Sequence, residues 1–495
     1  MFLIIGLYVV GAIIGIYYLR QRQTHELMES RVSNSLVAIT AVFAFVARML
    51  ISWFIEGQAR DVRCFQIWGH IMSAVGPGWF YKTSVFCRVH CDYPPLYMYV
   101  LSVNSVLSDL LGGSDQVMRM TFRFVPCLCD VIGCLVLYKV CCAVKFPSDR
   151  CFLLLVLMAF HPVMILNSAG WGQIDSVLAI LILCVAICAL YSKWRIALPL
   201  YVVAVLTKPQ ALLLGPLGFI FMIITWLRNK SSRKDIIVGL FMSVLVFFAS
   251  IIPFSIRQNW DWIIKLYTKT LESYPYVTIN AANIYYLFGG NWVDIGQSAS
   301  VFAGILFGIL CIAYDISWLI YARDQKHYMI EGIGIGLFGV CFIVLGILHV
   351  SWLLIGSMVM VFIFGIILST AIRYANIRLL PWLGGLLFIL LYVFGVKMHE
   401  RYILPAFFLL FYAWIVQKDR RILYLLLLFT ATSFINEWIV LDNSIRLGVT
   451  LGHLNEDTVW IADIISILNV IGTIWAGCLN IQYCTVRNKA HVCVV

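Results

Sequence analysis

Long apolar runs alternate with short polar segments along the whole chain. Runs such as residues 36–55, 237–252, 379–394 and 459–481 are mostly close to the roughly 20 residues that a helix needs to cross about 30 Å of hydrocarbon. The strands of a membrane β-barrel would alternate apolar and polar residues, and these runs do not. Because every backbone polar group in lipid must be paired within its own segment, the pattern predicts membrane-spanning helices.

The composition supports the same interpretation. Of 495 residues, 62% are hydrophobic and only 12% are charged, and the mean hydropathy is +0.94. A water-soluble globular domain carries about 25% charged residues. Lipid must therefore surround most of the chain, and the fold class that we expect is all-α and polytopic. The first apolar run, residues 2–19, lacks the basic start and the small-residue cleavage site of a signal peptide, so we interpret it as a retained helix.

The excess of positive charge, formally +11, is distributed among short loops and does not follow one face or arm, which argues against nucleic acid as a partner. The positive-inside rule places such loops in the cytoplasm. This assignment predicts about 13 to 15 membrane segments, with the amino terminus outside. The basic segments are residues 20–31, 145–150, 193–195, 228–234, 323–326, 373–378, 418–421 and 487–489.

The remaining polar clusters, which were not used to build this topology, all fall outside the cytoplasm. One-sided polar clusters are typical of a single extracytoplasmic active site, whereas a carrier should place polar groups near the bilayer midplane. We expect one transmembrane domain over residues 1–495 with no separate soluble domain, and an amphipathic surface helix at 94–111. The clusters are the first outer loop at 56–123 and the segments 170–175, 207–210, 274–280 and 397–402.

Most of the 16 cysteines lie inside apolar runs, where cysteine behaves as a small hydrophobic residue. The spacing of the cysteines and histidines does not fit a zinc site. Cys64, Cys87 and Cys91 share one polar loop, and the sequence leaves open whether two of them form a disulfide.

Two aspartates of the first outer loop are candidates for acid–base chemistry. Asp61 follows the end of a membrane helix, where desolvation would raise its pKa and make it a better proton acceptor. The alternative is a solvated carboxylate paired with Arg60 or Arg63. Asp92 precedes Tyr-Pro-Pro, so it is also a candidate cap for the helix that these prolines begin.

Two further outer segments combine charge with apolar surroundings. Gln173 and Asp175 lie beside Trp171 in a turn between helices, which is typical of a sugar-binding corner, although Asp175 could equally cap the next helix. Lys208 lies in a proline-broken stretch, where an unpaired cation costs about 2.5 to 3.5 kcal/mol, so we expect an anionic partner: a protein carboxylate or a lipid phosphate.

A second cationic cluster occurs late in the chain, where His399 and Arg401 follow Lys397. Glu400 would neutralise part of this charge. Positioned cations stabilise the negative charge that develops on a departing phosphate, so this turn suits a lipid-linked phosphate donor.

Six motifs in this order resemble the GT-C superfamily of multi-pass glycosyltransferases. More narrowly, the chain looks like bacterial membrane proteins similar to the second mannosyltransferase of glycosylphosphatidylinositol assembly, and it shares Asp-Tyr-Pro-Pro with the glucosyltransferases of N-glycan assembly. Many relatives have glycine after these prolines, where this chain has Leu96. The motifs are Asp61-x-x-x-Phe-x-x-Trp68, Cys91-Asp92-Tyr93-Pro94-Pro95, Gly170-Trp171-Gly172-Gln173-Ile174-Asp175, Thr207-Lys208-Pro209-Gln210, Tyr276 to Asn283, and His399-Glu400-Arg401-Tyr402.

The resemblance implies a GT-C fold with two juxtamembrane helices in the first outer loop and a polyprenyl-phosphate-linked sugar as donor. Asp61 then matches the catalytic base, Asp92 the second carboxylate of the loop, and His399 the histidine near the donor phosphate. We expect the donor phosphate at Lys208, His399 and Arg401, and substrate contacts from Trp171, Gln173, Asp175, Tyr276, Asn280 and Asn283.

The expected function is transfer of a hexose, mannose by default, to an acceptor hydroxyl on a lipid, polysaccharide or protein, with inversion because only one carboxylate is well placed. Some members of the superfamily use a divalent ion, Mg²⁺ or Mn²⁺, but the scattered carboxylates of this chain do not indicate one. The resemblance suggests a bacterial plasma membrane with the active site facing outside. A lipid-linked-sugar flippase or transporter is the alternative, and it predicts inverted repeats and midplane charges; a non-catalytic membrane scaffold is a third reading.

Overall fold

The chain forms two compact units, which were analysed in a computed structural model that describes residues 2–21, 32–321, 327–447 and 456–486. Unit 1 comprises Met1–Tyr274, Ile377–Gly385 and Ile403–Gly452. Unit 2 comprises Pro275–Asn376, Leu386–Tyr402 and His453–Val495. The basic segments predicted at 323–326 and 487–489 lie outside the described residues, as does the segment predicted at 20–31 from residue 22 on.

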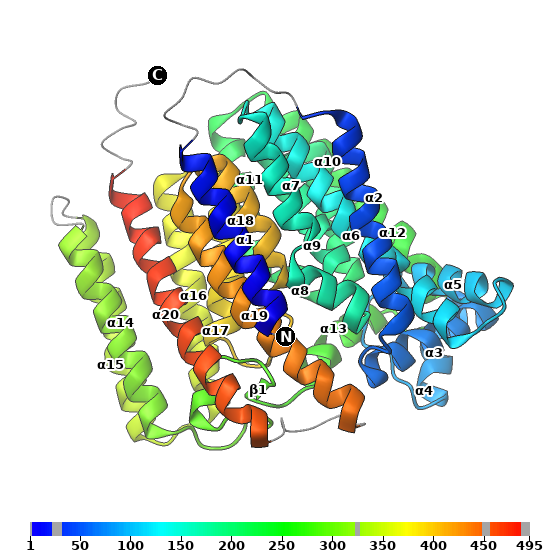
Figure 1. The fold of residues 1–495 in the computed structure, drawn as a ribbon. Helices are drawn as coiled ribbons and strands as arrows, with labels where there is room; N and C mark the ends of the chain where they lie inside the picture. Colours follow the sequence, from blue (N-terminus) through cyan, green and yellow to red (C-terminus); the bar gives the residue numbers. More distant parts are fainter. Residues whose placement is uncertain (1, 22–31, 322–326, 448–455, 487–495) are drawn as a thin grey trace. The chain divides into compact units, whose positions relative to one another are not determined.

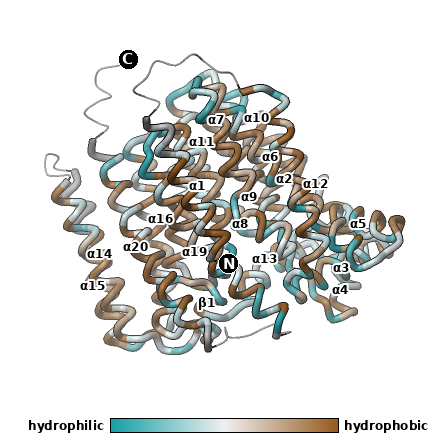
Figure 2. The backbone as a smooth tube through the Cα atoms, viewed as in Figure 1, coloured by the Kyte–Doolittle hydropathy of each residue, from teal (hydrophilic) through white to brown (hydrophobic). Residues whose placement is uncertain are grey.

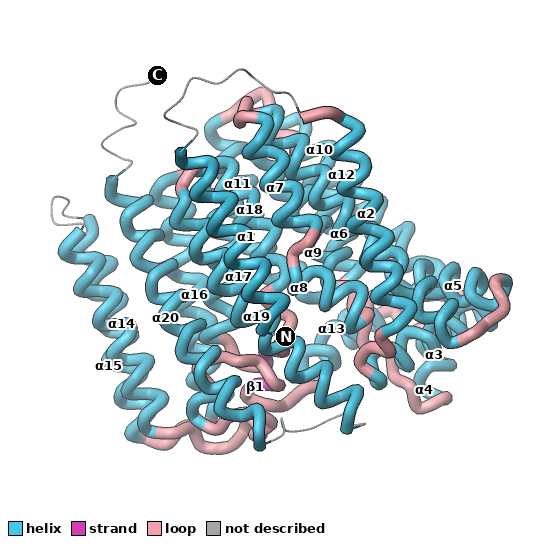
Figure 3. The backbone as a smooth tube through the Cα atoms, in the orientation of Figure 1, coloured by secondary structure: helices cyan, strands magenta, loops and turns pink. Residues whose placement is uncertain are grey.

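Unit 1 is entirely helical in its described part (Figure 1). Short loops join most of its helices (Figure 3). Its helices are α1 (Phe2–Gln21), α2 (Asn34–Phe54), α3 (Ala59–Val75), α4 (Pro77–Phe86), α5 (Pro95–Leu110), α6 (Asp115–Ala143), α7 (Ser148–Ala159), α8 (Pro162–Ile165), the π-helical turn η2 (Leu166–Trp171), α9 (Asp175–Leu190), α10 (Trp194–Thr207), the 3₁₀ helix η3 (Pro209–Leu214), α11 (Gly215–Arg228), α12 (Ser232–Ser255), α13 (Trp262–Glu272), η5 (Ile377–Leu379), α18 (Leu404–Gln417) and α19 (Arg420–Leu447).

Unit 2 combines membrane-length helices with one very short parallel sheet. The sheet pairs β1 with β2 and places Ile279 opposite His399. The helix α17 begins within residues assigned to unit 1 and continues into unit 2. The elements of unit 2 are β1 (Thr278–Ile279), η4 (Tyr286–Phe288), α14 (Val301–Tyr321), α15 (His327–Ile347), α16 (Trp352–Tyr374), α17 (Leu380–Phe394), β2 (Met398–His399) and α20 (Glu456–Val486).

Among the described residues, ten helical segments are long and apolar enough to cross a membrane, and five shorter apolar helices accompany them. The apolar runs 36–55, 237–252, 379–394 and 459–481 correspond to α2, α12, α17 and α20. The hydrophobic residues are spread along these helices, and hydrophilic residues gather at helix ends and around α3, α4 and α13 (Figure 2). The predicted class, an all-α polytopic membrane protein, is therefore confirmed.

The first outer loop differs from its predicted form at its end and in its number of helices. The helix α6 begins at Asp115, where Ser114 accepts a hydrogen bond from the amide of Val117, so the last residues of the predicted loop 56–123 are helical. Three helices, α3, α4 and α5, lie between α2 and α6, one more than the resemblance implies. The helix predicted at 94–111 is confirmed as α5, and its position along the membrane surface stays a prediction.

Buried polar pairs hold the helices of unit 1 together. Nε of Arg48 in α2 lies 3.0 Å from Oδ2 of Asp130 in α6, and both side chains are fully buried. The hydroxyl of Ser168 in η2 donates to the same oxygen at 2.6 Å. Because a charge in hydrocarbon is costly unless paired, this cluster fixes the register of α2, α6 and η2.

In unit 2, α14 and α15 form a hairpin whose helices approach closely at small residues. A Cβ added at Gly304 would lie 2.5 Å from Cα of Gly346, and one added at Gly308 would lie 2.7 Å from the carbonyl oxygen of Gly339. Helices in lipid associate by such close backbone approach, because the hydrophobic effect does not drive them together there. Substituting either glycine would therefore separate the hairpin.

Candidate active site

Asp61 lies in the first turn of α3 and is half-buried. The side-chain oxygen of Gln58 caps this helix by accepting a hydrogen bond from the Asp61 amide at 2.7 Å. Nε1 of Trp171 donates to Oδ2 of Asp61 at 2.8 Å, and Nε2 of Gln173 donates to the same oxygen at 2.5 Å. Both donors address one oxygen, so they fix the orientation of the carboxylate, and the helix N-terminus favours its negative charge.

The π-helical turn η2 presents these two donors. The chain reverses at Gly172, whose φ of +91° is in the left-handed region, and the amides of Gly172 and Gln173 both donate to the carbonyl oxygen of Asn167. A Cβ at Gly172 would lie 2.9 Å from Nε of Arg123. Glycine is required here both for the backbone conformation and for the space that the arginine occupies.

Arg123 of α6 joins the end of α2 to η2 by hydrogen bonds to backbone carbonyl oxygens. Nη1 donates to Ile55 and to Ala169, each at 2.8 Å, and Nη2 donates to Glu56 at 2.7 Å. Arg123 was not among the predicted site residues, because 56–123 was treated as one loop. An arginine inside an apolar run, at the end away from the basic loops, is the sequence signal that identifies it.

Asp92 lies between α4 and α5, and its backbone carbonyl accepts a hydrogen bond from the hydroxyl of Thr270 at 2.9 Å. Burial raises the pKa of the Asp92 carboxyl above its ordinary value, and the negative charge of Asp61 adds to the rise, whereas His90 and Lys208 oppose it. Asp92 does not cap α5, because Pro94 is the N-cap residue and no side chain bonds there. The expected alternative role as a cap is therefore wrong.

Tyr93 follows Asp92 and contacts the three other segments of the site, which carry Asp61, Gln173 and Lys208. Its hydroxyl donates to Oε1 of Gln173 at 3.4 Å, and Nζ of Lys208 lies 5.8 Å from its ring centroid. The ring packs against Phe65 and Trp68 of α3, with both ring centroids at 5.6 Å. Tyr93 thus holds the loop that carries Asp92 against the helix that carries Asp61.

Lys208 has a protein carboxylate as partner. Its Nζ donates to Oδ1 of Asp175, and both side chains are buried. Nδ2 of Asn167 donates to the other carboxylate oxygen at 3.3 Å. Asp175 opens α9 without capping it, since the N-cap is Ile174 and no side chain bonds there. The predicted break in the helix is confirmed, because α10 ends at Thr207 and Pro209 begins η3.

In unit 2, the cationic turn follows β2 and contains its own carboxylate. Nη1 of Arg401 donates to Oε1 of Glu400 at 2.5 Å, and Nδ1 of His399 lies 4.0 Å from Oε2 of the same residue. The His399 ring packs on Tyr402 at 4.8 Å between centroids. As the sequence predicted, Glu400 offsets part of the positive charge.

The two asparagines expected to contact substrate have structural partners. Oδ1 of Asn280 accepts from Asn291 at 3.0 Å and from the indole of Trp292 at 3.1 Å. Oδ1 of Asn283, which is fully buried, accepts from the amides of Tyr285 and Tyr286. These contacts shape the loop next to β2, because Asn280 also forms a bridge with His399. Tyr276 is half-buried and packs edge-on against Trp292.

The predicted residues therefore form two groups. In unit 1, hydrogen bonds, the buried ion pair and the charges that act on Asp92 link Asp61, Asp92, Trp171, Gln173, Asp175 and Lys208. In unit 2, the β1–β2 pairing and its bridges assemble Asn280 and His399, with Tyr276, Asn283 and Arg401 in the adjoining segments. Trp171 is only 2% exposed, so its indole orients Asp61 and presents no open face to a sugar ring.

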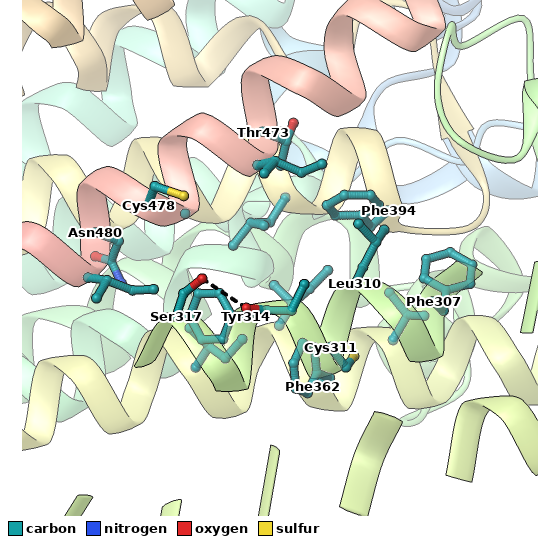
Figure 4. A pocket seen from close by; sticks show the side chains of 18 of the residues that line it. Phe307, Leu310, Cys311, Tyr314, Ser317, Phe362, Phe394, Thr473, Cys478 and Asn480 are labelled. Atoms are coloured by element: carbon teal, nitrogen blue, oxygen red, sulfur yellow. Dashed lines mark hydrogen bonds between the residues drawn. The ribbon is translucent and has the colours of Figure 1, made fainter. Parts of the chain in front are cut away.

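An apolar cavity of about 150 Å³ lies within unit 2 (Figure 4). The residues of α17 that line it are Leu386, Leu390 and Phe394. Phe307 of α14 and Thr473 of α20 face it from the other helices. Phe394 lies only five positions before His399, so α17 runs from the cavity toward the cationic turn.

Among the described residues, no three His, Cys, Asp or Glu side chains gather in a way that could hold a metal ion. Cys64, Cys87 and Cys91 are free thiols, and burial raises the pKa of Cys64 to about 11. No protein-family model matches the chain, and no curated protein matches it.

Proposed function

We propose that the protein is a membrane glycosyltransferase that moves a hexose from a polyprenyl-phosphate-linked donor to an acceptor hydroxyl. The observation that carries the proposal is the oriented carboxylate of Asp61, held by Trp171 and Gln173 beside a second carboxylate, Asp92. Two carboxylates at the end of a set of membrane-spanning helices suit proton removal from a sugar hydroxyl. The motif order that resembles the GT-C superfamily supports the same activity.

In the proposed reaction, Asp61 accepts the proton of the acceptor hydroxyl while that oxygen attacks the anomeric carbon and the lipid phosphate departs. Hydrogen bonds from Trp171 and Gln173 keep one oxygen of the carboxylate engaged and direct the group. A general base of this kind contributes on the order of 10² to 10⁴ in rate. Orientation of the two substrates and stabilisation of the departing phosphate supply the remainder.

The donor half of the proposal rests on unit 2. His399 and Arg401 present cations that suit a phosphate, and the apolar cavity beside α17 suits the adjoining part of a lipid chain. Lys208 is the third cation assigned to the donor, and its pairing with Asp175 makes it an indirect participant.

The positions of the acidic and basic segments of unit 1 support a site outside the cytoplasm. Within unit 1, Asp61, Asp175 and Lys208 lie at the ends of α3, α9 and α10, and the basic turns at 145–150 and 193–195 lie at the other ends of the helices that lead to them. The positive-inside rule would then put the carboxylates outside the cytoplasm. Nucleotide sugars are absent there, so a lipid-linked donor is the consistent choice.

Inversion is the proposed stereochemistry, because a single base suffices for it and Asp61 is the carboxylate with directed donors. Retention would require a second carboxylate as nucleophile, and Asp92 would be that group. Proton NMR of the anomeric position in the product distinguishes the two outcomes. A product with retained configuration would overturn the single-displacement mechanism.

The test of the function is transfer of radiolabelled sugar by the purified protein in liposomes supplied with polyprenyl-phosphate-mannose or polyprenyl-phosphate-glucose and extracted membrane acceptors. We expect label to pass to an acceptor from one of these donors. A parallel assay follows the donor's movement between leaflets. Movement of intact donor without transfer would overturn the proposal in favour of a lipid-linked-sugar flippase.

A further inference from the structure

A second cavity, of about 320 Å³, lies in unit 1, and Asp61 is not among the residues that line it. Its walls come from α4, from the segment after α4, from the loop before α13 and from α13 itself. Tyr81 and Trp262 form an aromatic base, with ring centroids 5.2 Å apart. The cavity has the volume of a small-molecule site, since such sites begin at about 300 Å³.

The charge around this cavity is mainly positive. Lys82, Lys265, Lys269 and His90 line it, and Asp261 is the only carboxylate among the lining residues. Asp261 is already engaged, because its Oδ2 lies 2.7 Å from Nζ of Lys265. Lys82 and Lys269 are exposed and carry the excess charge. A phosphate-bearing group matches this lining, since lysine acts as a point charge toward phosphate.

Exposed aromatic residues are next in sequence to residues that line the cavity, near the end of a candidate membrane span. The candidate span α12 ends at Ser255, and Trp260 follows within a few residues with 89% of its surface exposed. Phe86, at the end of α4, is 88% exposed. The ring of Trp79 in α4 packs under the guanidinium of Arg257 at 4.7 Å. Exposed aromatic residues beside Lys and Arg are typical of the membrane–water interface.

Hydrogen bonds tie both walls of the cavity to the segment of the second carboxylate. The hydroxyl of Tyr81, in the α4 wall, donates to the carbonyl oxygen of Tyr93 at 2.8 Å. The hydroxyl of Thr270, in α13, donates to the carbonyl oxygen of Asp92 at 2.9 Å. The positive charge of His90 also acts on the Asp92 carboxyl. Both walls of the cavity are therefore anchored to the segment that carries Asp92.

We propose that this basic cavity binds the phosphate-bearing headgroup of an anionic membrane lipid, with Lys82 and Lys269 contacting the phosphate and the neighbouring exposed aromatic residues contacting the start of the acyl chains. The assignment of this lipid as the acceptor of the sugar rests on the proposed function. An acceptor held here would extend its headgroup hydroxyls toward Asp92 and Asp61. Sugar transfer would then be selective for anionic glycerophospholipids or their glycosylated derivatives.

Binding is tested first without any transfer reaction. The probes are dihexanoyl phosphatidylglycerol, dihexanoyl phosphatidylcholine and glycerol 3-phosphate, titrated into the purified full chain in a neutral detergent by isothermal titration calorimetry. We expect phosphatidylglycerol to bind at least tenfold more tightly than the other two, and added NaCl to weaken it. Equal binding of the two lipids would overturn the proposal. Equal binding of glycerol 3-phosphate and phosphatidylglycerol would assign the cavity to a soluble phosphate instead.

The variant for this test is the double substitution Lys82→Gln and Lys269→Gln, which removes two exposed charges and disturbs no ion pair between described side chains. Its matched control is Lys230→Gln with Lys234→Gln, two exposed lysines of which one precedes α12 and one lies in its first turn. We expect at least a tenfold loss of phosphatidylglycerol affinity in the first variant and none in the control. Unchanged affinity in both would overturn the site.

The role as acceptor site is tested separately with the transfer assay. If the lipid is the acceptor, the same double variant raises KM for the lipid and leaves kcat within about twofold, because it weakens binding of the ground state and of the transition state equally. Loss of lipid affinity with an unchanged KM would leave the binding site standing and overturn its role as acceptor site. A protein that transfers no sugar but binds the lipid selectively would refute the proposed function and retain the cavity's ligand.

Discussion

The polar groups of unit 1 and of unit 2 are held in place by different kinds of contact. In unit 1, side chains bond directly to side chains across more than 100 residues of sequence, as Asp61 does with Trp171 and Gln173. In unit 2, two short strands and their bridges align the backbones of Asn280 and His399. The carboxylates of unit 1 should therefore respond to the loss of single side chains more than the cationic turn does.

This difference also separates the roles that we propose. A base must present one lone pair in a narrow range of directions, so directed donors suit it. A phosphate accepts hydrogen bonds from many directions, and cations with several N–H groups on an aligned backbone suffice for it. We therefore expect variants in unit 1 to change kcat and variants in unit 2 to change the KM of the donor.

The largest effect is expected at the buried ion pair of unit 1. Lys208→Met leaves Asp175 buried without its cation, which should destabilise the protein by about 3 to 5 kcal/mol. The double variant with Asp175→Asn should recover most of this loss. Thermal unfolding of the purified proteins measures both, with Lys193→Met, exposed at the other end of α10, as control. Equal stability of Lys208→Met and wild type would contradict a structural pairing.

The next effect concerns Arg123, which positions η2 and so the donors to Asp61. Arg123→Lys keeps the charge but cannot reach the carbonyls of Ile55, Ala169 and Glu56 together, so kcat should fall about tenfold with the donor KM unchanged. Steady-state kinetics with the labelled donor measure the two constants. A rise in KM at constant kcat would instead place Arg123 in ground-state binding and weaken the contrast between the units.

A smaller effect is expected in unit 2, on the KM of the donor and not on kcat. Arg401→Lys replaces a planar fork by a single ammonium group at the proposed donor phosphate, so the donor KM should rise several-fold while kcat changes by less than about twofold. Arg373→Lys, at the end of α16, is the matched control. The comparison between units breaks down if Arg401→Lys lowers kcat alone.

The smallest effect is a pH dependence of stability at Asp92. Because burial raises the pKa of this carboxyl in the folded protein, its contribution to stability is fully present at low pH and is lost as pH rises through that raised pKa. Asp92→Asn should therefore raise Tm at pH 7 by a few degrees, with a gain that shrinks toward pH 4. Thermal scans at several pH values give the difference, and a gain independent of pH would contradict a buried, titrating carboxyl.

Some of these features could be predicted from the sequence, and others depend on tertiary contacts. Hydropathy predicted the spans, and the amphipathic pattern predicted α5. Both signals lie within a single segment of the sequence. The break before Pro209 followed from the missing amide of proline. The partner of Lys208 was left open between a carboxylate and a lipid phosphate, since Asp175 is 33 positions away in the sequence and no local pattern links the two.

The site contacts that were not predicted join residues that are far apart in the sequence. Neither the donation from Trp171 to Asp61 nor the cluster of carbonyls around Arg123 leaves a pattern in the sequence. The interpretation of Asn280 and Asn283 as substrate ligands remains a prediction, and the structure adds their hydrogen bonds within the loop. Asparagine at a positive φ, as at Asn280 with +54°, is the local signal of a structural role.

The most direct test of the account is sugar transfer by wild type and by Asp61→Asn at equal expression, with Asp109→Asn in α5 as control. The asparagine retains an oxygen that can accept from Trp171 and Gln173 but cannot take up a proton, so the change isolates the base. We predict a loss of about 10² to 10⁴ in kcat for Asp61→Asn and none for the control. Undiminished transfer by Asp61→Asn would contradict the central claim and move the base to Asp92.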